Sequence, residues 1–355
     1  GSASVNNDGE FYAGAKYGVA RGIYAIANTT SVTGTGAIDA YGYSNAFGIQ
    51  AIGFDSTSVD VAGDIYATAD QYAVGIYAYA GAGGATVVNG GQVEAQGYLS
   101  VGISAISLGD VAVSNGGDII AGDGIYNDVG IGIRAVTAAA GGSATVDNTG
   151  TINASGDYAG VGINAIAGAG TVSVTNGGQI YAYAGDKYGY GALGILATAY
   201  GDATVDSSGL VSVFSAGEAN GIAAASSQGN VAVSNSGDIE VQSGAAINYS
   251  AIGINARAQV GGITIDNTGA IYAAGKYAIG ASAIAYGDIA IANGAGASID
   301  VYSGLGTAFG VYGYSIAGNV QVDNAGDISA VGDSTAVGVI AVAGNGDAGI
   351  TSGGN

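Results

Sequence analysis

Residues 146–154 read Val-Asp-Asn-Thr-Gly-Thr-Ile-Asn-Ala, and the loop that follows leads into Gly-Ile-Asn-Ala at residues 162–165. The same phrase returns at residues 174–182 and 265–273, each time followed by a Gly-x-x-Ala segment. Self-similarity at a short, nearly constant period is the sequence signature of a repeat protein. This phrase therefore decides how the rest of the chain is interpreted.

The repeat fills the whole chain of 355 residues. The glycine after the Asn position recurs at intervals of 26 to 33 residues, at Gly9, Gly36, Gly63, Gly91, Gly117, Gly150, Gly178, Gly209, Gly237, Gly269, Gly296 and Gly326. Twelve units leave no room for a second domain, so residues 1–355 are predicted to form one repeat domain. Gly1 and Ser2 look like a cloning remnant, and both ends are expected to fall within a repeat.

Each unit has the pattern of three short strands. In one unit, residues 111–113, 119–121 and 133–135 alternate with a period of two, and Gly, Asn and Asp lie between them. Three strands of three to five residues cannot bury a core alone. Stacked units can, because each strand pairs with its copy in the next unit at about 4.8 Å. The sequence predicts an all-β, three-sided parallel β-solenoid of about twelve coils, roughly 55–60 Å long.

The Asn of the repeated phrase is predicted to face inward. Val146, Asn148, Gly150, Ile152 and Ala154 are each two residues apart, so they share one side of the chain path. At a corner, Asn tolerates left-handed geometry, and its amide can bond to the copies above and below. The predicted structural ladder comprises Asn7, Asn89, Asn115, Asn148, Asn176, Asn235, Asn267, Asn293 and Asn324. The other three units have Gly34, Val61 and Ser207 at this position.

Composition excludes several classes of function. The chain has no Cys and no His, so zinc, iron–sulfur, haem–His, thiol and Ser-His-Asp chemistries lack their usual groups. Its 27 acidic and 6 basic residues give a net charge of −21, which argues against nucleic acid and anionic membranes as partners. No apolar run approaches the roughly 20 residues of a membrane-spanning helix. We expect no cofactor and no direct membrane insertion.

Acidic residues often follow glycine, as in Gly109-Asp110, Gly201-Asp202 and Gly287-Asp288. Carboxylate oxygens suit calcium, but the nine-residue Gly-Gly-x-Gly-x-Asp calcium repeat is missing. Turn formation and solubility are the favoured interpretation, and we predict no metal site. We also predict no catalytic residue.

The phrases at residues 146–152, 233–239 and 265–271 give the chain a family resemblance. It resembles the passenger region of autotransporter adhesins and related haemagglutinin-like surface proteins of Gram-negative bacteria, over nearly its whole length. The resemblance implies a right-handed β-helix, export to the cell surface and display on a stalk. The lack of Cys and Pro agrees with export of an unfolded chain, because neither disulfides nor slow proline isomerisation then delay folding.

We therefore expect a non-catalytic extracellular segment, a rigid rod at the bacterial cell surface that acts in adhesion, self-association or display. Its expected partner is a host or bacterial surface glycan or protein, a second copy of itself included. One alternative is a passive spacer whose binding tip lies outside this segment. A second is a polysaccharide-processing enzyme, which paired carboxylates would favour. The third-strand residues Arg134 and Arg257 lie in well-separated units without a dense acidic cluster.

The loops between the second and third strands vary most in length, and insertions on one side of a solenoid often mark a binding side. Tyr beside Asp or Asn suits sugar rings, because aromatic faces stack and polar groups bond to hydroxyls. The candidate binding residues are Tyr126, Asp128, Asp186, Tyr188, Tyr190 and Tyr249. The alternative is that these Tyr side chains only cover the apolar edge between coils.

A second apolar position in the third strand has two interpretations. If this strand is regular, an exposed stripe is formed by Ile26, Ile52, Ile106, Val136, Ile166, Ile284 and Val342. If the chain bends at the preceding Ala, these residues belong to the core. The alternation of residues does not choose between the two.

Overall fold

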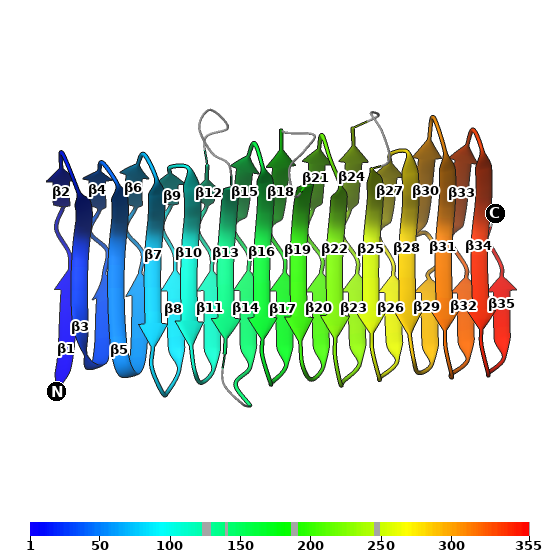
Figure 1. Ribbon diagram of the computed structural model, residues 1–355, viewed down its shortest axis with the longest axis horizontal. Helices are drawn as coiled ribbons and strands as arrows, with labels where there is room; N and C mark the ends of the chain where they lie inside the picture. Colours follow the sequence, from blue (N-terminus) through cyan, green and yellow to red (C-terminus); the bar gives the residue numbers. More distant parts are fainter. Residues whose placement is uncertain (123–128, 139–140, 186–190, 245–248, 355) are drawn as a thin grey trace.

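The computed structural model describes residues 1–122, 129–138, 141–185, 191–244 and 249–354. The chain winds into coils that stack along one axis, with its two ends at opposite ends of the rod (Figure 1). Every strand pair is parallel, and the second strands alone form a twelve-stranded sheet. The predicted parallel β-solenoid of about twelve coils is confirmed. The described ranges contain no helix capable of crossing a membrane.

Each coil contributes a first, a second and a third strand. In the fifth coil these are β11 (Val111–Asn115), β12 (Ile119–Ala121) and β13 (Val129–Thr137). Each pairs with its equivalent on both sides: β11 with β8 and β14, β12 with β9 and β15, and β13 with β10 and β16. Backbone donors and acceptors of the coil are therefore used by its two neighbours.

The remaining strands repeat this plan. The first strands are β1 (Ser2–Asn7), β8 (Ala85–Asn89), β14 (Ala144–Asn148), β17 (Val172–Asn176), β20 (Ala203–Ser207), β23 (Val231–Asn235), β26 (Ile263–Asn267), β29 (Ile289–Asn293), β32 (Val320–Asn324) and β35 (Ala348–Ser352). The second strands are β2 (Phe11–Ala15), β4 (Ile38–Gly42), β6 (Ile65–Ala69), β9 (Val93–Gln96), β15 (Thr151–Gly156), β18 (Gln179–Ala184), β21 (Val211–Ser215), β24 (Ile239–Ser243), β27 (Ala270–Ala274), β30 (Ser298–Ser303) and β33 (Asp327–Gly332). The third strands are β7 (Tyr72–Ala80), β10 (Leu99–Ser107), β16 (Ala159–Ala167), β19 (Gly191–Ala199), β22 (Ala219–Ser226), β25 (Ser250–Ala258), β28 (Tyr277–Ala285), β31 (Thr307–Ser315) and β34 (Thr335–Ala343).

The third strand differs from the expectation of three to five residues. It is nine residues long in β13 and β16, and it bends in the middle. In the first two coils it runs on into the next first strand, as β3 (Val19–Gly34) and β5 (Asn45–Val61). First and third strands consequently belong to one 23-stranded sheet, so the solenoid has two sheets where three sides were predicted.

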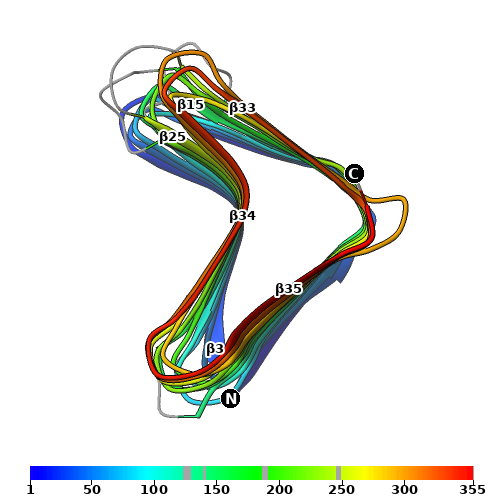
Figure 2. The same ribbon diagram turned by 90° about the vertical axis from the view of Figure 1, so that its right-hand side faces the viewer.

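A glycine causes the bend of each third strand. The pairing of β13 with β16 matches Ile131 to Val161 and Ile133 to Ile163, but it omits Gly132. A Cβ at Gly132 would meet Cγ2 of Ile152 in the second strand and the carbonyl oxygen of Gly162 in the next coil. Only glycine permits this approach. The bend makes the third side of the coil concave, as β34 shows in the end-on view (Figure 2).

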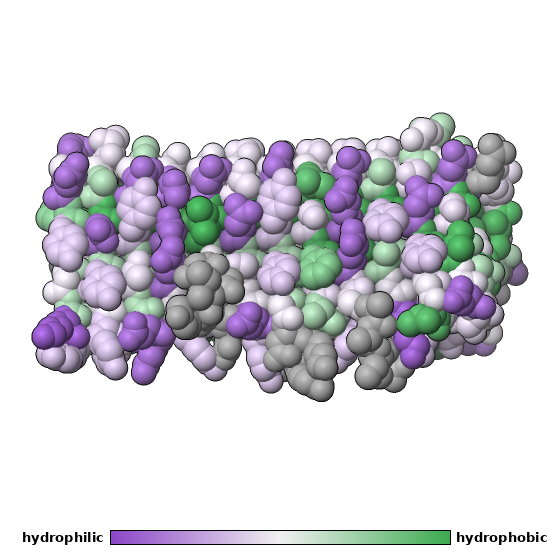
Figure 3. All heavy atoms as spheres, turned by 90° about the horizontal axis from the view of Figure 1, so that it is seen from above, coloured by the Kyte–Doolittle hydropathy of each residue, from purple (hydrophilic) through white to green (hydrophobic). Residues whose placement is uncertain are grey.

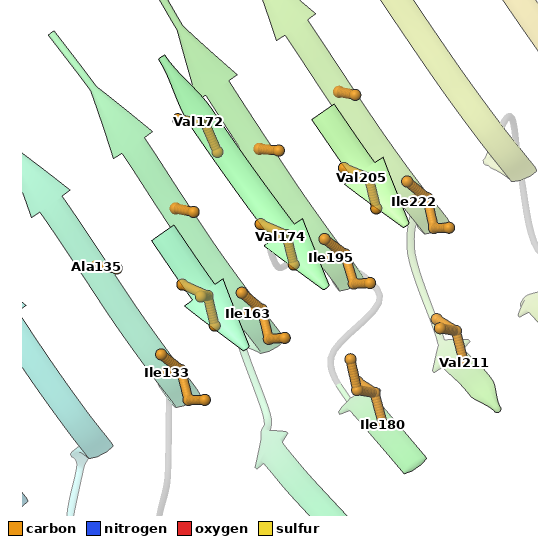
Figure 4. Close-up of a cluster of buried hydrophobic side chains, with 14 of the residues drawn as sticks. Ile133, Ala135, Ile163, Val172, Val174, Ile180, Ile195, Val205, Val211 and Ile222 are labelled. Atoms are coloured by element: carbon orange, nitrogen blue, oxygen red, sulfur yellow. The ribbon is translucent and has the colours of Figure 1, made fainter. Parts of the chain in front are cut away.

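Aliphatic side chains fill the interior. Ile133, Ile163 and Ile195 come from successive third strands and are fully buried. They stack on one another and face second-strand residues such as Ile180 (Figure 4). No coil encloses a core alone, but each coil covers the apolar side chains of the next. The aliphatic side chains are therefore buried along the length of the rod.

The predicted Asn residues form hydrogen-bonded rows at the end of the first strands. Asn148 Nδ2 donates to Gly150 O at 3.0 Å and to Asn176 Oδ1 at 2.9 Å. One row runs through Asn89, Asn115, Asn148 and Asn176 to Ser207, and the other through Asn235, Asn267, Asn293 and Asn324. Asn7 lies apart from both, since Gly34 and Val61 follow it, and its Nδ2 donates to Gly36 O at 3.1 Å.

Ser207→Asn is expected to join the two rows and to raise the free energy of unfolding by about 1 kcal/mol. Ser207 pairs in register with Asn235, whose buried Oδ1 has no partner. An Asn there would accept from Asn176 and donate to Asn235. Chemical denaturation of both proteins measures the gain, with Ser208→Asn at the exposed neighbour as a control without effect. A loss of stability would contradict the prediction.

Candidate functional site

The concave face is the outward surface of the third strands. We define it by Val129, Ile131, Arg134 and Val136 of β13 and by the residues in register with them in the other coils, which are the first, third, sixth and eighth residues of a nine-residue third strand. The bend turns the two halves of the strand toward each other, so that the backbone of this side is concave along the rod (Figure 2). Residues from many coils are thereby brought onto one continuous surface.

The concave face carries positive charge on an acidic protein. No third strand contains Asp or Glu, nor do residues 19–27 and 45–53 of β3 and β5, although the chain has 27 acidic residues. All three Arg residues of the chain lie here: Arg21 in the first coil, Arg134 in the fifth and Arg257 in the ninth. Neighbouring Arg residues are thus four coils apart, or roughly 19 Å at the strand spacing.

Aromatic and apolar side chains cover the first coils of this face. Phe47 is 8% exposed and packs with Val74 and Val101 in a cluster separate from the main core. Its ring meets Tyr72 and Tyr77 edge-on, with centroids 5.8 and 6.1 Å apart. These residues lie outside the main core and bury one another on the concave face.

Arg21 lies beside this cluster at the first coil. Its guanidinium is 5.1 Å from the Tyr24 ring centroid and 5.8 Å from that of Phe47, and its Nε donates to Gln50 Oε1. Stacking on aromatic rings is a typical use of Arg, because its planar cation is weakly hydrated.

A polar row crosses the middle of the concave face. Tyr77, Ser104, Arg134 and Asn164 occupy the same position in four successive coils and pair in register. Ser104 is fully buried, and its neighbours Ile103 and Ala105 belong to the core, so its side chain lies on the concave face. Neither Ser104 Oγ nor Asn164 Oδ1 has a hydrogen-bond partner. Ser104 Oγ and Asn164 Oδ1 are thus buried oxygens without a hydrogen-bond partner, and they lie in the coils on either side of Arg134.

Burial raises the pKa of Tyr72 and of Tyr77, and the nearby Arg134 guanidinium opposes part of that rise. Both phenols therefore stay protonated well above neutral pH. They present hydroxyl groups and apolar ring surface together, which is the chemistry that aromatic binding sites use.

The apolar stripe of the third strands faces outward. The chain bends at the glycine of Gly-Ile-x-Ala, three residues before the Ala at which a bend would have placed the stripe in the core. The strand is regular beyond that glycine, so its side chains alternate between the core and the outer surface. Ile106 and Ile166 are half-buried and belong to no core cluster, whereas Ile26 and Val342 near the two rod ends are 47% and 40% exposed. The stripe forms one margin of the concave face, and its interpretation as core is wrong.

Most of the loop residues predicted to bind lie outside the described residues: Tyr126, Asp128, Asp186, Tyr188 and Tyr190. Tyr249 is half-buried just before β25, and its carbonyl oxygen accepts a hydrogen bond from Tyr277 N–H at 3.3 Å. The structure does not place Tyr249 on the concave face as defined. In the sequence, Arg134 and Arg257 stand out only as isolated basic residues. The lack of Asp and Glu in the third strands could have shown that both belong to one surface.

The second strands form a different surface. Figure 3 looks onto this part of the rod, where aromatic rings and hydrophilic side chains alternate. The exposed rings of Tyr183 and Phe214 stack with centroids 5.5 Å apart and planes 7° apart. Burial and then the carboxylates of Asp64 and Glu94 raise the pKa of Tyr66. This surface is acidic, in contrast to the concave face.

The Asp residues of the Gly-Asp turns bond to the next coil. Oδ1 of Asp110 accepts from Ser143 N–H at 2.9 Å, and Oδ1 of Asp202 accepts from Asn230 N–H at 2.7 Å. Asp288 does the same for Asn319 N–H at 2.7 Å. Within the ranges that the structure describes, no group of three or more acidic side chains converges as a metal site would require. These carboxylates hold the turns in register.

Comparisons of this chain with protein-family models, curated proteins and solved structures found no match. Because a fold alone does not define a function, the function has to be argued from the chemistry of the faces of the rod.

Proposed function

We propose that this chain is a non-catalytic extracellular segment, a rigid rod that acts in adhesion or display at a bacterial surface and binds its partner along the concave face. The observation that carries the proposal is the scarcity of acidic residues on that face in a chain with net charge −21: no third strand contains Asp or Glu, and Glu218, just before β22, is the one acidic residue in register with the face. A surface kept so distinct from the others over the whole rod is suited to a long contact.

The stacking of the coils supports the rod as a rigid carrier. Backbone pairing joins each strand to the next coil, and the Asn rows and Ile stacks run beside it. In such arrays each repeat contacts only its neighbours, so stability accumulates along the axis. A binding face on this carrier stays extended without a partner, which avoids the entropy cost of ordering on binding.

The two alternatives require other features. A passive spacer does not require a face on which Arg, aromatic and half-buried Ile side chains lie together. A glycosidase uses a pair of carboxylates across the scissile bond, and the concave face offers none. The carboxylates of Asp110, Asp202 and Asp288 already accept backbone hydrogen bonds. These observations favour adhesion.

Display of the chain on a non-adherent bacterium is expected to increase attachment to host cells or to other bacteria. The double variant Ile106→Glu and Ile166→Glu should return attachment to background, because two carboxylates then lie on the concave face. Thr145→Glu and Thr175→Glu add the same charge on exposed first-strand positions and should have no effect. Circular dichroism checks that both variants fold.

No gain in attachment on display of the unmodified chain would contradict adhesion and favour the spacer. Release of reducing ends from a polysaccharide by the purified chain would contradict the non-catalytic assignment.

A further inference from the structure

We propose that the concave face binds a linear acidic polysaccharide of low charge density. Arg134, Ser104 and Asn164 hold one carboxylate or sulfate group, and the aromatic cluster at Tyr77 lies against the adjoining sugar rings. This inference rests on the proposed function and names the ligand class of the same face.

The polar row supplies the anion site. The guanidinium of Arg134 has a planar fork of donors that matches the oxygens of a carboxylate or sulfate. Ser104 Oγ can donate, and rotation of the Asn164 amide presents its Nδ2 in the place of Oδ1. The buried oxygens of Ser104 and Asn164 have no partner in the protein. A buried polar atom without a partner is costly, and a ligand anion removes that cost.

The spacing of the Arg residues indicates a long ligand. Arg21, Arg134 and Arg257 recur every fourth coil, roughly 19 Å apart along the axis. They occupy the third, sixth and eighth positions of their strands, so they cross the concave face obliquely. A small anion needs one such site, whereas a polymer that lies along the axis meets all three. Nucleic acid carries one charge per about 1.7 Å and needs many cations, so three Arg residues on an acidic protein fit a sparser charge.

The face favours sugar over peptide. An extended peptide would add to a sheet through its backbone, but the third strands pair with the coils on both sides and leave no free edge along the face. Recognition must therefore come from side chains. Tyr72 and Tyr77 offer apolar ring surface with a hydroxyl at its rim, which matches a sugar ring with its apolar face and polar edge.

Binding of the purified chain to immobilised polysaccharides tests the inference. Hyaluronan carries only carboxylates, a dextran sulfated to the same charge spacing as hyaluronan carries only sulfates, and dextran is neutral. We expect binding to at least one charged polymer, weakening with added salt, and none to dextran. The better charged polymer identifies the group that the Arg134 site prefers.

Variants then assign the site. Arg134→Gln should weaken binding about tenfold, as expected when a charge-assisted hydrogen bond is lost. Lys16→Gln, which removes one positive charge from an exposed turn, should leave affinity unchanged. Ser104→Ala should weaken binding about threefold while the unfolding temperature stays constant or rises, because a buried hydroxyl without a partner is removed. If Ser104 had only a structural role, Ser104→Ala would not weaken binding while the unfolding temperature stayed constant or rose.

Three outcomes would overturn the inference: no binding to either charged polymer, equal losses for Arg134→Gln and Lys16→Gln, or equally tight binding to duplex DNA. If attachment of the displayed chain still depends on the concave face in those cases, the ligand class is wrong and the adhesive function stands. If attachment itself is absent, the proposed function is also wrong.

Discussion

Gly162→Ala is expected to lower the free energy of unfolding by about 3 kcal/mol, at the upper end of the usual cost of overpacking. The new methyl group would overlap Cγ2 of Ile180 in the second strand and the carbonyl oxygen of Gly194 in the next coil. Neither can retreat, because Ile180 is fully buried between coils and Gly194 lies at the bend of the next third strand. Guanidinium unfolding followed by circular dichroism measures the loss.

The same chain offers a matched control for this variant. Gly338 occupies the same position in the last coil, and a Cβ there would have no atom within 4 Å. Gly338→Ala is therefore expected to change stability by less than about 0.5 kcal/mol. Equal losses for both variants would mean that backbone freedom at the bend, and not contact with the second strand and next coil, requires glycine.

Asn148→Ala is expected to cost about 2–4 kcal/mol. The change removes the bonds to Gly150 O and Asn176 Oδ1 and the acceptor for Asn115 Nδ2 at 2.8 Å. It leaves Asn176 Oδ1 buried without a donor, and each unpaired buried group costs about 1–3 kcal/mol. Asp147→Ala, at the exposed preceding residue, is the control and should be nearly neutral. A loss below about 1 kcal/mol for Asn148→Ala would show that the row contributes little stability.

The Asn row that Asn148→Ala tests could be predicted from the sequence, whereas the bend that Gly162→Ala tests could not. Asn148 was assigned to a stacked row because the phrase around it recurs and its inward neighbours are apolar. The role of Gly162 was not predicted, because glycine is frequent in this chain and spacing alone does not tell a turn glycine from one at a bend. That distinction needs the position of Ile180, which comes from another strand of the next coil.

The concave face was missed for a related reason. Ser104, Arg134 and Asn164 are each 30 residues apart, but units vary from 26 to 33 residues, so alignment of their side chains depends on where each loop absorbs the difference. Whether Ile106 faced the core or the solvent likewise depended on the residue at which the strand bends. The predicted loop residues fall largely outside the described ranges, and among them only Tyr249 is placed.

Local pattern was sufficient for the coil count, the parallel stacking and the identity of the Asn rows, because each follows from a phrase that every unit repeats and from the period of two along a strand. The bend, the two-sheet arrangement and the concave face were decided only when the coils were packed together. They arise from contacts between atoms of different strands and coils, such as Gly132 with Ile152 and Tyr77 with Phe47, and these distances are set by the packed rod and not by the order of residues.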